Sequence, residues 1–306
     1  MPFGLLSLLI GQIFGNTVVP IGTKIVEVFT GPLLFVLLRF STATVVLFLL
    51  FLLSRKKRLK LREYEDFMIL GILLSVNVIL FTVGISYTTV IMSTLIYSIT
   101  PILVGILGHY FLGERLDKQK AIGFLFAITG FFILICNSLT GMQRNTFGHP
   151  LGNILIFIAM LGYSTYVFYS RKVLHTKDNT PIQTTFLTFS FTSVILLCAF
   201  LVSVVLKQQT LAIIPGNGIV GVIIVGVGSV AQYLFLQIGV KKTSAFTASL
   251  FQYLSPFIAA SATIPLLHEK VTLSFIVGGF FILLGVFTAT TFVQIQRKIK
   301  LSTVKH

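Results

Sequence analysis

Residues 98–114 read SITPILVGILGHYFLGE, and residues 253–269 read YLSPFIAASATIPLLHE. Each stretch has a proline in fourth place and a glutamate in last place, so Pro101 pairs with Pro256 and Glu114 with Glu269 at one offset of 155 residues. The same offset pairs glycines on both sides of these stretches: Gly71 with Gly226, Gly84 with Gly239, Gly123 with Gly278, and Gly130 with Gly285. Matched Pro, Glu and Gly are rarer by chance than matched Leu or Phe in an apolar chain, so the sequence contains an internal duplication.

The composition around this duplication is that of a membrane protein. Hydrophobic residues make up 55% of the 306-residue chain and charged residues only 10%, whereas a soluble domain carries about 25% charged residues. So little charge cannot cover a water-soluble body. A helix needs about 20 mostly apolar residues to cross the hydrocarbon core of a bilayer. Ten stretches qualify: residues 3–23, 32–54, 66–86, 90–112, 119–137, 150–171, 184–206, 216–237, 245–267 and 272–294.

The ten predicted spans divide evenly between two halves. We expect an all-α integral membrane fold, because a lipid-exposed backbone must form its hydrogen bonds within its own helix. Residues 1–137 form the first five-span repeat, 138–149 a linker, 150–294 the second repeat, and 295–306 a basic tail. Because five is an odd number, the second repeat enters the membrane from the opposite side, and the halves form an inverted pair. Inverted repeats are typical of secondary transporters, which bind their solute near the midplane between the halves.

The distribution of basic residues predicts the orientation. The connections on the side of the two termini, together with the C-terminal tail, hold 18 Lys and Arg residues, and the connections on the other side hold 4. Basic loops stay in the cytoplasm, so we expect both termini to be cytoplasmic and the protein to lie in the cell membrane. The net charge of +15 is therefore interpreted as a topology signal and not as a nucleic-acid-binding surface.

The duplicated motifs resemble a known family. The stretch from Ser98 to Arg115, followed by Gly123 and Gly130, is similar to the end of an EamA domain, and the second half repeats it. The Leu-Arg-Phe triplet at residues 38–40 is similar to another landmark of that family. The resemblance covers nearly the whole chain as two EamA units. It implies a member of the drug/metabolite transporter superfamily, whose ten-helix members export amino acids or other small metabolites.

Polar side chains inside the spans are the candidate substrate-binding residues, because an unpaired polar group in hydrocarbon is costly. Asn77 and Gln232 are repeat-equivalent, and the positions before the paired prolines are also polar. The predicted binding set is Asn16, Asn77, Tyr97, Thr100, Tyr163, Gln232, Gln252 and Tyr253. The alternative for each is hydrogen bonding between helices without a role in transport.

A second group is interpreted as structural or gating. Pro101 and Pro256 are expected to kink their helices, and Glu114 and Glu269 fall at span ends beside a cation. Arg39 lies inside span 32–54, where it either reaches the headgroups with its long side chain or meets an anionic group of the substrate. His109 could titrate, or could be a structural residue.

The sequence gives little reason to expect an enzyme. It contains no HExxH motif, no P-loop and no paired carboxylates within a span. Cys136 and Cys198 lie in apolar runs without a ligand partner at metal-binding spacing, so neither a metal nor a cofactor is expected. A secondary transporter of a small metabolite working by alternating access is favoured, with an intramembrane enzyme or a non-transporting scaffold as the alternative. Substrate, coupling to protons and oligomeric state stay open.

Overall fold

The computed structural model describes residues 2–19, 26, 29–54, 61–88, 93, 96–114, 118–140, 149–176, 179–206, 215–255, 258 and 273–289. Within these ranges every regular element is a helix. The α-helices are α1 (Pro2–Asn16), α3 (Pro32–Leu53), α4 (Leu61–Ile85), α6 (Thr100–Leu112), α7 (Lys118–Thr140), α8 (Pro150–Thr176), α9 (Pro181–Val205), α10 (Gly216–Lys242), α11 (Ala245–Leu250) and α13 (Leu273–Phe287), with a 3-10 helix, η2 (Phe251–Leu254), after α11.

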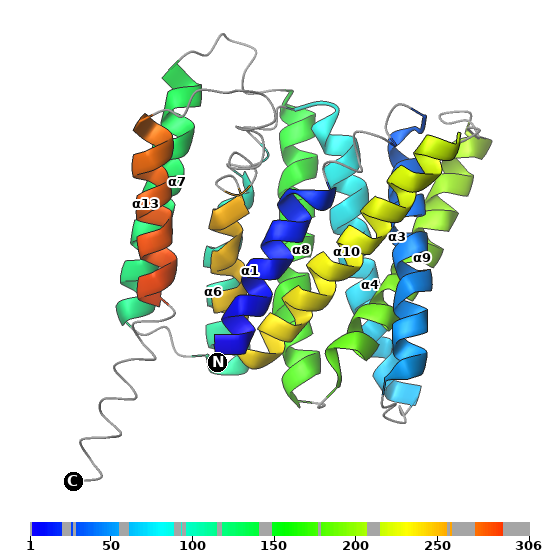
Figure 1. Cartoon of the computed structure of the whole chain (residues 1–306), viewed down its shortest axis with the longest axis horizontal. Helices are drawn as coiled ribbons and strands as arrows, with labels where there is room; N and C mark the ends of the chain where they lie inside the picture. The colour runs from blue at the N-terminus through cyan, green and yellow to red at the C-terminus, as the bar shows by residue number, and fades with distance from the viewer. Residues whose placement is uncertain are drawn as a thin grey trace.

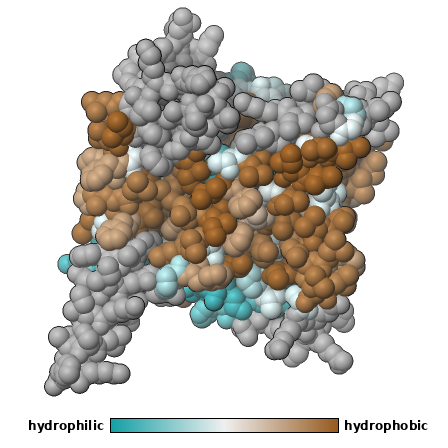
Figure 2. Space-filling view, in the orientation of Figure 1, coloured by the Kyte–Doolittle hydropathy of each residue, from teal (hydrophilic) through white to brown (hydrophobic). Residues whose placement is uncertain are grey.

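Five of these helices are long and apolar enough to cross a membrane: α3, α4, α8, α9 and α10. Their outward faces carry large exposed hydrophobic side chains such as Leu53 on α3 and Val205 on α9. Figure 2 shows apolar side chains covering the middle of the visible face, with hydrophilic residues gathered near its lower edge. A soluble protein would bury this much apolar surface, so the face is suited to contact with lipid.

Several helices extend beyond the predicted spans. Helix α4 begins at Leu61 and not at residue 66, and α8 continues to Thr176 and not only to residue 171. The two helices contact each other next to these extensions, where the hydroxyl of Tyr169 donates a 2.8 Å hydrogen bond to the carboxylate of Asp66. Polar residues at these ends kept them out of the hydrophobicity pattern, although the helices continue past the apolar core.

Pro101 does not kink a continuous helix, which was the prediction from the sequence. A turn at residues 98–99 precedes α6, and Pro101 lies in the first turn of that helix, where its missing N–H costs no hydrogen bond. The predicted span 245–267 is also interrupted. Its described part is the six-residue α11 followed by the 3-10 turn of η2, just before Pro256. Pro256 itself lies outside the described residues.

The two halves form equivalent helix pairs. Helix α4 packs along α8, and α1 packs along α10. These pairs are equivalent because α4 matches α10 in the repeat, and α1 and α8 are the first helices of the two halves. Helices α7 and α13, the last of each half, pair at the side of the main bundle (Figure 1). Their contact requires glycine, because a Cβ on Gly130 would lie 2.4 Å from the carbonyl oxygen of Gly278.

Equivalent helices of the two halves run in opposite directions. Gly152 and Gly162 of α8 meet Gly84 and Asn77 of α4. In contrast, Tyr166 and Arg171 of α8 meet Gln237 and Val240 of α10. Helix α8 is therefore antiparallel to α4 and parallel to α10. It follows that α4 and α10, which match in the internal repeat, are antiparallel to each other, as an inverted duplication requires.

Candidate functional site

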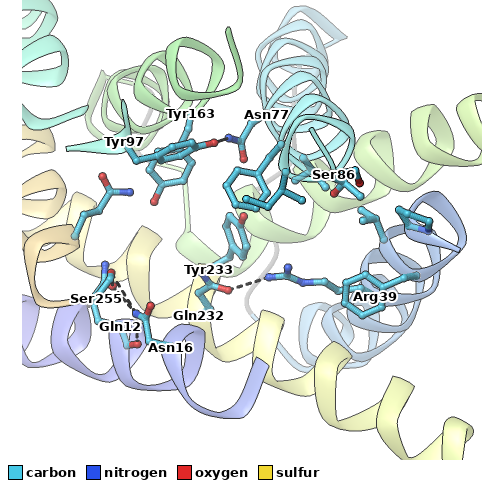
Figure 3. Close-up of a pocket in the computed structure, with 18 of the residues that line it drawn as sticks. Gln12, Asn16, Arg39, Asn77, Ser86, Tyr97, Tyr163, Gln232, Tyr233 and Ser255 are labelled. Atoms are coloured by element: carbon cyan, nitrogen blue, oxygen red, sulfur yellow. Dashed lines mark hydrogen bonds between the residues drawn. The ribbon is translucent and has the colours of Figure 1, made fainter. Parts of the chain in front are cut away.

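A cavity of about 730 Å³ lies between the two halves of the bundle. Helices α1, α3, α4, α8 and α10 contribute to its wall, together with Tyr97, Gln252 and Ser255 (Figure 3). The cavity extends to one end of the bundle, where Thr30 and Pro32 lie at the start of α3 and Ser86 follows the end of α4. Its volume falls within the range of about 300–1,000 Å³ that holds small organic ligands.

One wall of the cavity is built by Asn77 and two tyrosines. The side-chain nitrogen of Asn77 donates to the hydroxyl of Tyr97 at 2.5 Å and to the backbone oxygen of Ala159 at 3.0 Å. The ring of Tyr97 lies 6.2 Å from that of Tyr163, measured between centroids. These contacts join α4 to α8 and fix the Asn77 amide at the cavity surface, because its amide hydrogens already have partners.

A second polar wall joins α1 to the segment after η2. The side-chain nitrogen of Asn16 donates to Oε1 of Gln12 at 3.0 Å and to Oγ of Ser255 at 3.3 Å. Ser255 in turn donates to Oε1 of Gln12 at 2.8 Å. The three side chains form a closed hydrogen-bonded group on the opposite side of the cavity from Asn77 (Figure 3).

Arg39 contributes the only charged side chain among the described residues that line the cavity. Its Nε donates to Oγ of Ser229 at 2.7 Å, and its Nη2 donates to Oε1 of Gln232 at 3.0 Å. Both acceptors belong to α10, so the guanidinium is directed across to the other half of the protein. It does not extend along α3 toward the headgroups, which was one of the two interpretations of its position in the sequence.

Seven of the residues singled out in the sequence meet at this cavity: Asn16, Arg39, Asn77, Tyr97, Tyr163, Gln232 and Gln252. Two predicted binding residues are placed elsewhere. The hydroxyl of Tyr253 donates to the backbone oxygen of Ser98 at 2.7 Å, and the side chain of Thr100 is fully buried without a hydrogen-bond partner for its hydroxyl. Thr100 and Tyr253 therefore pack between helices and do not line the cavity.

The sequence did not single out several residues of the cavity wall, notably Gln12, Ser86 and Tyr233. Gln12 precedes Asn16 by one helical turn, so the shared helix face was a usable signal. Ser86 and Thr30 lie at helix ends, where a polar residue is ordinary and carries no signal.

At the end of the bundle opposite the cavity opening, an ion pair connects the segment just after α6 to α8. A carboxylate oxygen of Glu114 lies 3.3 Å from Nε of Arg171, and the same oxygen accepts a 3.1 Å hydrogen bond from the backbone N–H of Ala245 at the start of α11. Arg171 also donates to the backbone oxygens of Val240 and Lys241. Gly113, with a positive φ of 63°, ends α6 and turns the chain so that Glu114 can reach α8. Glu269, its repeat partner, lies outside the described residues.

The apolar helices, the two related halves and the polar cavity between them define a class: α-helical membrane proteins with a central site for a small solute. The family is identified by comparison with known proteins. The family model described as the EamA-like transporter family matches residues 2–136 and 150–291. The chain belongs to this family and is a membrane transporter built from two repeats.

Similar proteins carry matching descriptions. An uncharacterized transporter of Bacillus subtilis (strain 168), YyaM, is 27% identical over 261 residues, which is 84% of this chain and 83% of that protein. An uncharacterized transporter of Archaeoglobus fulgidus is 25% identical over 260 residues, 85% of this chain and 88% of that protein. One solved crystal structure has a TM-score of 0.73 at 15% identity, covering 95% of this chain and 96% of that chain, and so shares the fold.

Proposed function

We propose that this transporter is a secondary carrier that moves a small metabolite, an amino acid or a related solute, out of the cell by alternating access. The observation that carries the proposal is the position of the cavity. It lies between two antiparallel halves, and both Asn77 and its repeat partner Gln232 line it. A site shared by two inverted halves can be exposed to either side when the halves exchange conformations.

The two ends of the bundle support this mechanism because they differ. The cavity extends to the end that carries Thr30 and Ser86, while the Glu114–Arg171 ion pair joins α6, α8 and α11 at the other end. If the basic loops are cytoplasmic, the ion pair lies on the cytoplasmic side and the cavity faces outward. Glu114 and Arg171 then serve as a gate that must separate before the cavity can open inward.

Purified protein reconstituted into liposomes tests the proposal. Flux of radiolabelled amino acids and metabolites should be saturable. Unlabelled solute on the other side of the membrane should increase the rate at which the labelled solute is transported, as in a counterflow experiment. Replacing both Asn77 and Gln232 by Leu should abolish this flux. Thr129→Val, a polar-to-apolar change at an exposed position of α7, is the matched control and should leave flux unchanged.

The same experiment addresses the other interpretations. A scaffold would show no flux for any solute, with or without a proton gradient, and an intramembrane enzyme would change the solute chemically. Wild-type flux in the Asn77→Leu, Gln232→Leu double variant would remove the cavity from the transport route.

A further inference from the structure

The electrostatic character of the cavity is one-sided. Arg39 is the only charged side chain among the described residues that line it, and those residues include neither Asp nor Glu. A cation at membrane depth is costly unless another charge or strong hydrogen-bond acceptors compensate it. The acceptors present, Ser229 and Gln232, are both neutral. The described lining of the cavity is therefore complementary to an anion and offers no counter-charge to a cation.

We propose that Arg39 anchors a carboxylate of the transported solute, and that the substrates are small organic acids with an apolar or aromatic body. This inference rests on the proposed carrier function and names the substrate class of the same cavity. A guanidinium is suited to this role because it stays charged and matches the planar geometry of a carboxylate.

The hydrogen bonds of Arg39 leave one side of its guanidinium free. Ser229 holds Nε and Gln232 holds Nη2, whereas no described residue accepts a hydrogen bond from Nη1. A guanidinium has five N–H donors, so those of Nη1 are available to an oxygen of the solute. The two acceptors on α10 fix the direction of the group, which reduces the side-chain entropy lost on binding.

The rest of the cavity is suited to the body of such an acid. Among the described residues, five aromatic side chains line it: Phe35, Phe81, Tyr97, Tyr163 and Tyr233. Their rings offer apolar contact and stacking to an uncharged body. The side chains of Asn77 and Gln252 add two amide groups to the cavity lining. Oε1 of Gln252 is buried without a hydrogen-bond partner.

Three probes that share one body separate the alternatives: 3-phenylpropanoate, 3-phenylpropanamide and 3-phenylpropan-1-amine. Binding to the purified full-length protein is measured by isothermal titration calorimetry at pH 7.5. We expect the acid to bind at least about tenfold more tightly than the amide, because a charge-assisted pair is stronger than a neutral hydrogen bond. The amine should bind more weakly than either.

Variants of Arg39 test whether this side chain is the cause. Arg39→Gln should remove the preference for the acid over the amide, and Arg39→Lys should keep part of it. Lys118→Gln removes a charge from an exposed position at the start of α7, so it should keep the full preference. Circular dichroism and gel filtration verify that each variant is folded. If Arg39→Gln does not fold, the role of Arg39 is decided by Arg39→Lys and by the affinities of the wild-type protein for the three probes.

The outcomes distinguish the anchor from the carrier. Equal affinity for acid and amide, an acid preference that survives Arg39→Gln, or no binding of any probe at millimolar concentration would overturn the anchor. Saturable flux of neutral or cationic solutes would then leave the carrier standing. Arg39-dependent binding of the acid without flux of any solute in liposomes would instead support the anchor and contradict the carrier.

Discussion

Asn77 of α4 and Gln232 of α10 occupy equivalent positions in the two repeats, and both line the cavity, but they form different hydrogen bonds. Asn77 donates to the hydroxyl of Tyr97, whereas Gln232 accepts from the guanidinium of Arg39. The duplication thus places one amide on each side of the cavity, and the neighbours make the two sides chemically different. A site of this kind can hold a solute with one polar end and one apolar end.

Replacing Asn77 by Leu should lower transport at least about tenfold, because the change removes the amide and its bonds to Tyr97 and Ala159. The expected loss of stability is small, about 1–2 kcal/mol, since interhelical hydrogen bonds in membranes contribute little each. Liposome flux and thermal unfolding measure the two effects. Ser75→Ala on the same helix removes only a bond to the backbone of Gly71 and should retain flux. Equal loss in both variants would contradict a specific role for Asn77.

Replacing Glu114 by Gln should destabilise the closed end of the bundle. The change leaves the partly buried charge of Arg171 without its counter-charge, and breaking such a pair costs about 3 kcal/mol or more when it is well buried. The thermal midpoint of the purified protein should fall accordingly. Glu65→Gln, on an exposed turn of α4, is the control. An unchanged midpoint in Glu114→Gln would show that the ion pair does not hold this end together.

Replacing Gly130 by Val should separate α7 from α13. Even a Cβ at this position would lie 2.4 Å from the backbone oxygen of Gly278 and 2.7 Å from the backbone nitrogen of Ile282, and backbone atoms cannot move away locally. Small residues permit such close helix contacts in membranes. We expect a lower thermal midpoint and faster proteolysis, measured in detergent. Gly216→Ala, at a position where nothing lies within 4 Å of the added Cβ, should behave as wild type.

Replacing Thr100 by Val should leave transport unchanged and leave stability equal or slightly higher. The hydroxyl of Thr100 is buried without a partner, and an unpaired buried polar group costs about 1–3 kcal/mol. Valine has nearly the same shape and removes that group. A strong loss of flux with an intact fold would instead support the prediction from sequence that Thr100 contacts the substrate.

The fold was largely predictable, because the signals that determine it are long and repeated. A run of apolar residues such as 32–54 identifies a span without reference to its neighbours, and the matched glycines at 71 and 226 reveal the duplication. The family match confirms the two repeats. The local effect of Pro101 was not predicted. Pro101 lies in the first turn of α6, directly after the turn at residues 98–99, and the pattern of apolar residues does not distinguish a kinked helix from an interrupted one.

The cavity was predictable only in part. Asn77 and Gln232 could be identified because the repeat singles them out, and Arg39 because a charge inside a span is rare. Tyr253 and Thr100 lie among the same polar residues before a proline as Tyr97 and Gln252, yet only the latter two reach the cavity. The difference is the direction of each side chain around an interrupted helix. Directions of this kind depend on tertiary packing, which hydrophobic periodicity does not encode.

Alternating access requires the two ends of the bundle to open in turn, and cysteine labelling from each side of the membrane can detect this. In a background with Cys136→Ser and Cys198→Ser, single cysteines replace Thr82, which lines the cavity, or Ser170, which is fully buried near the ion pair. A membrane-impermeant thiol reagent is applied from each side in turn, with Glu114 intact or changed to Gln. We expect Glu114→Gln to increase labelling of S170C from the side of the termini and to decrease labelling of T82C from the other side. If Glu114→Gln increased labelling at both positions, or altered labelling at neither, the result would contradict alternating access.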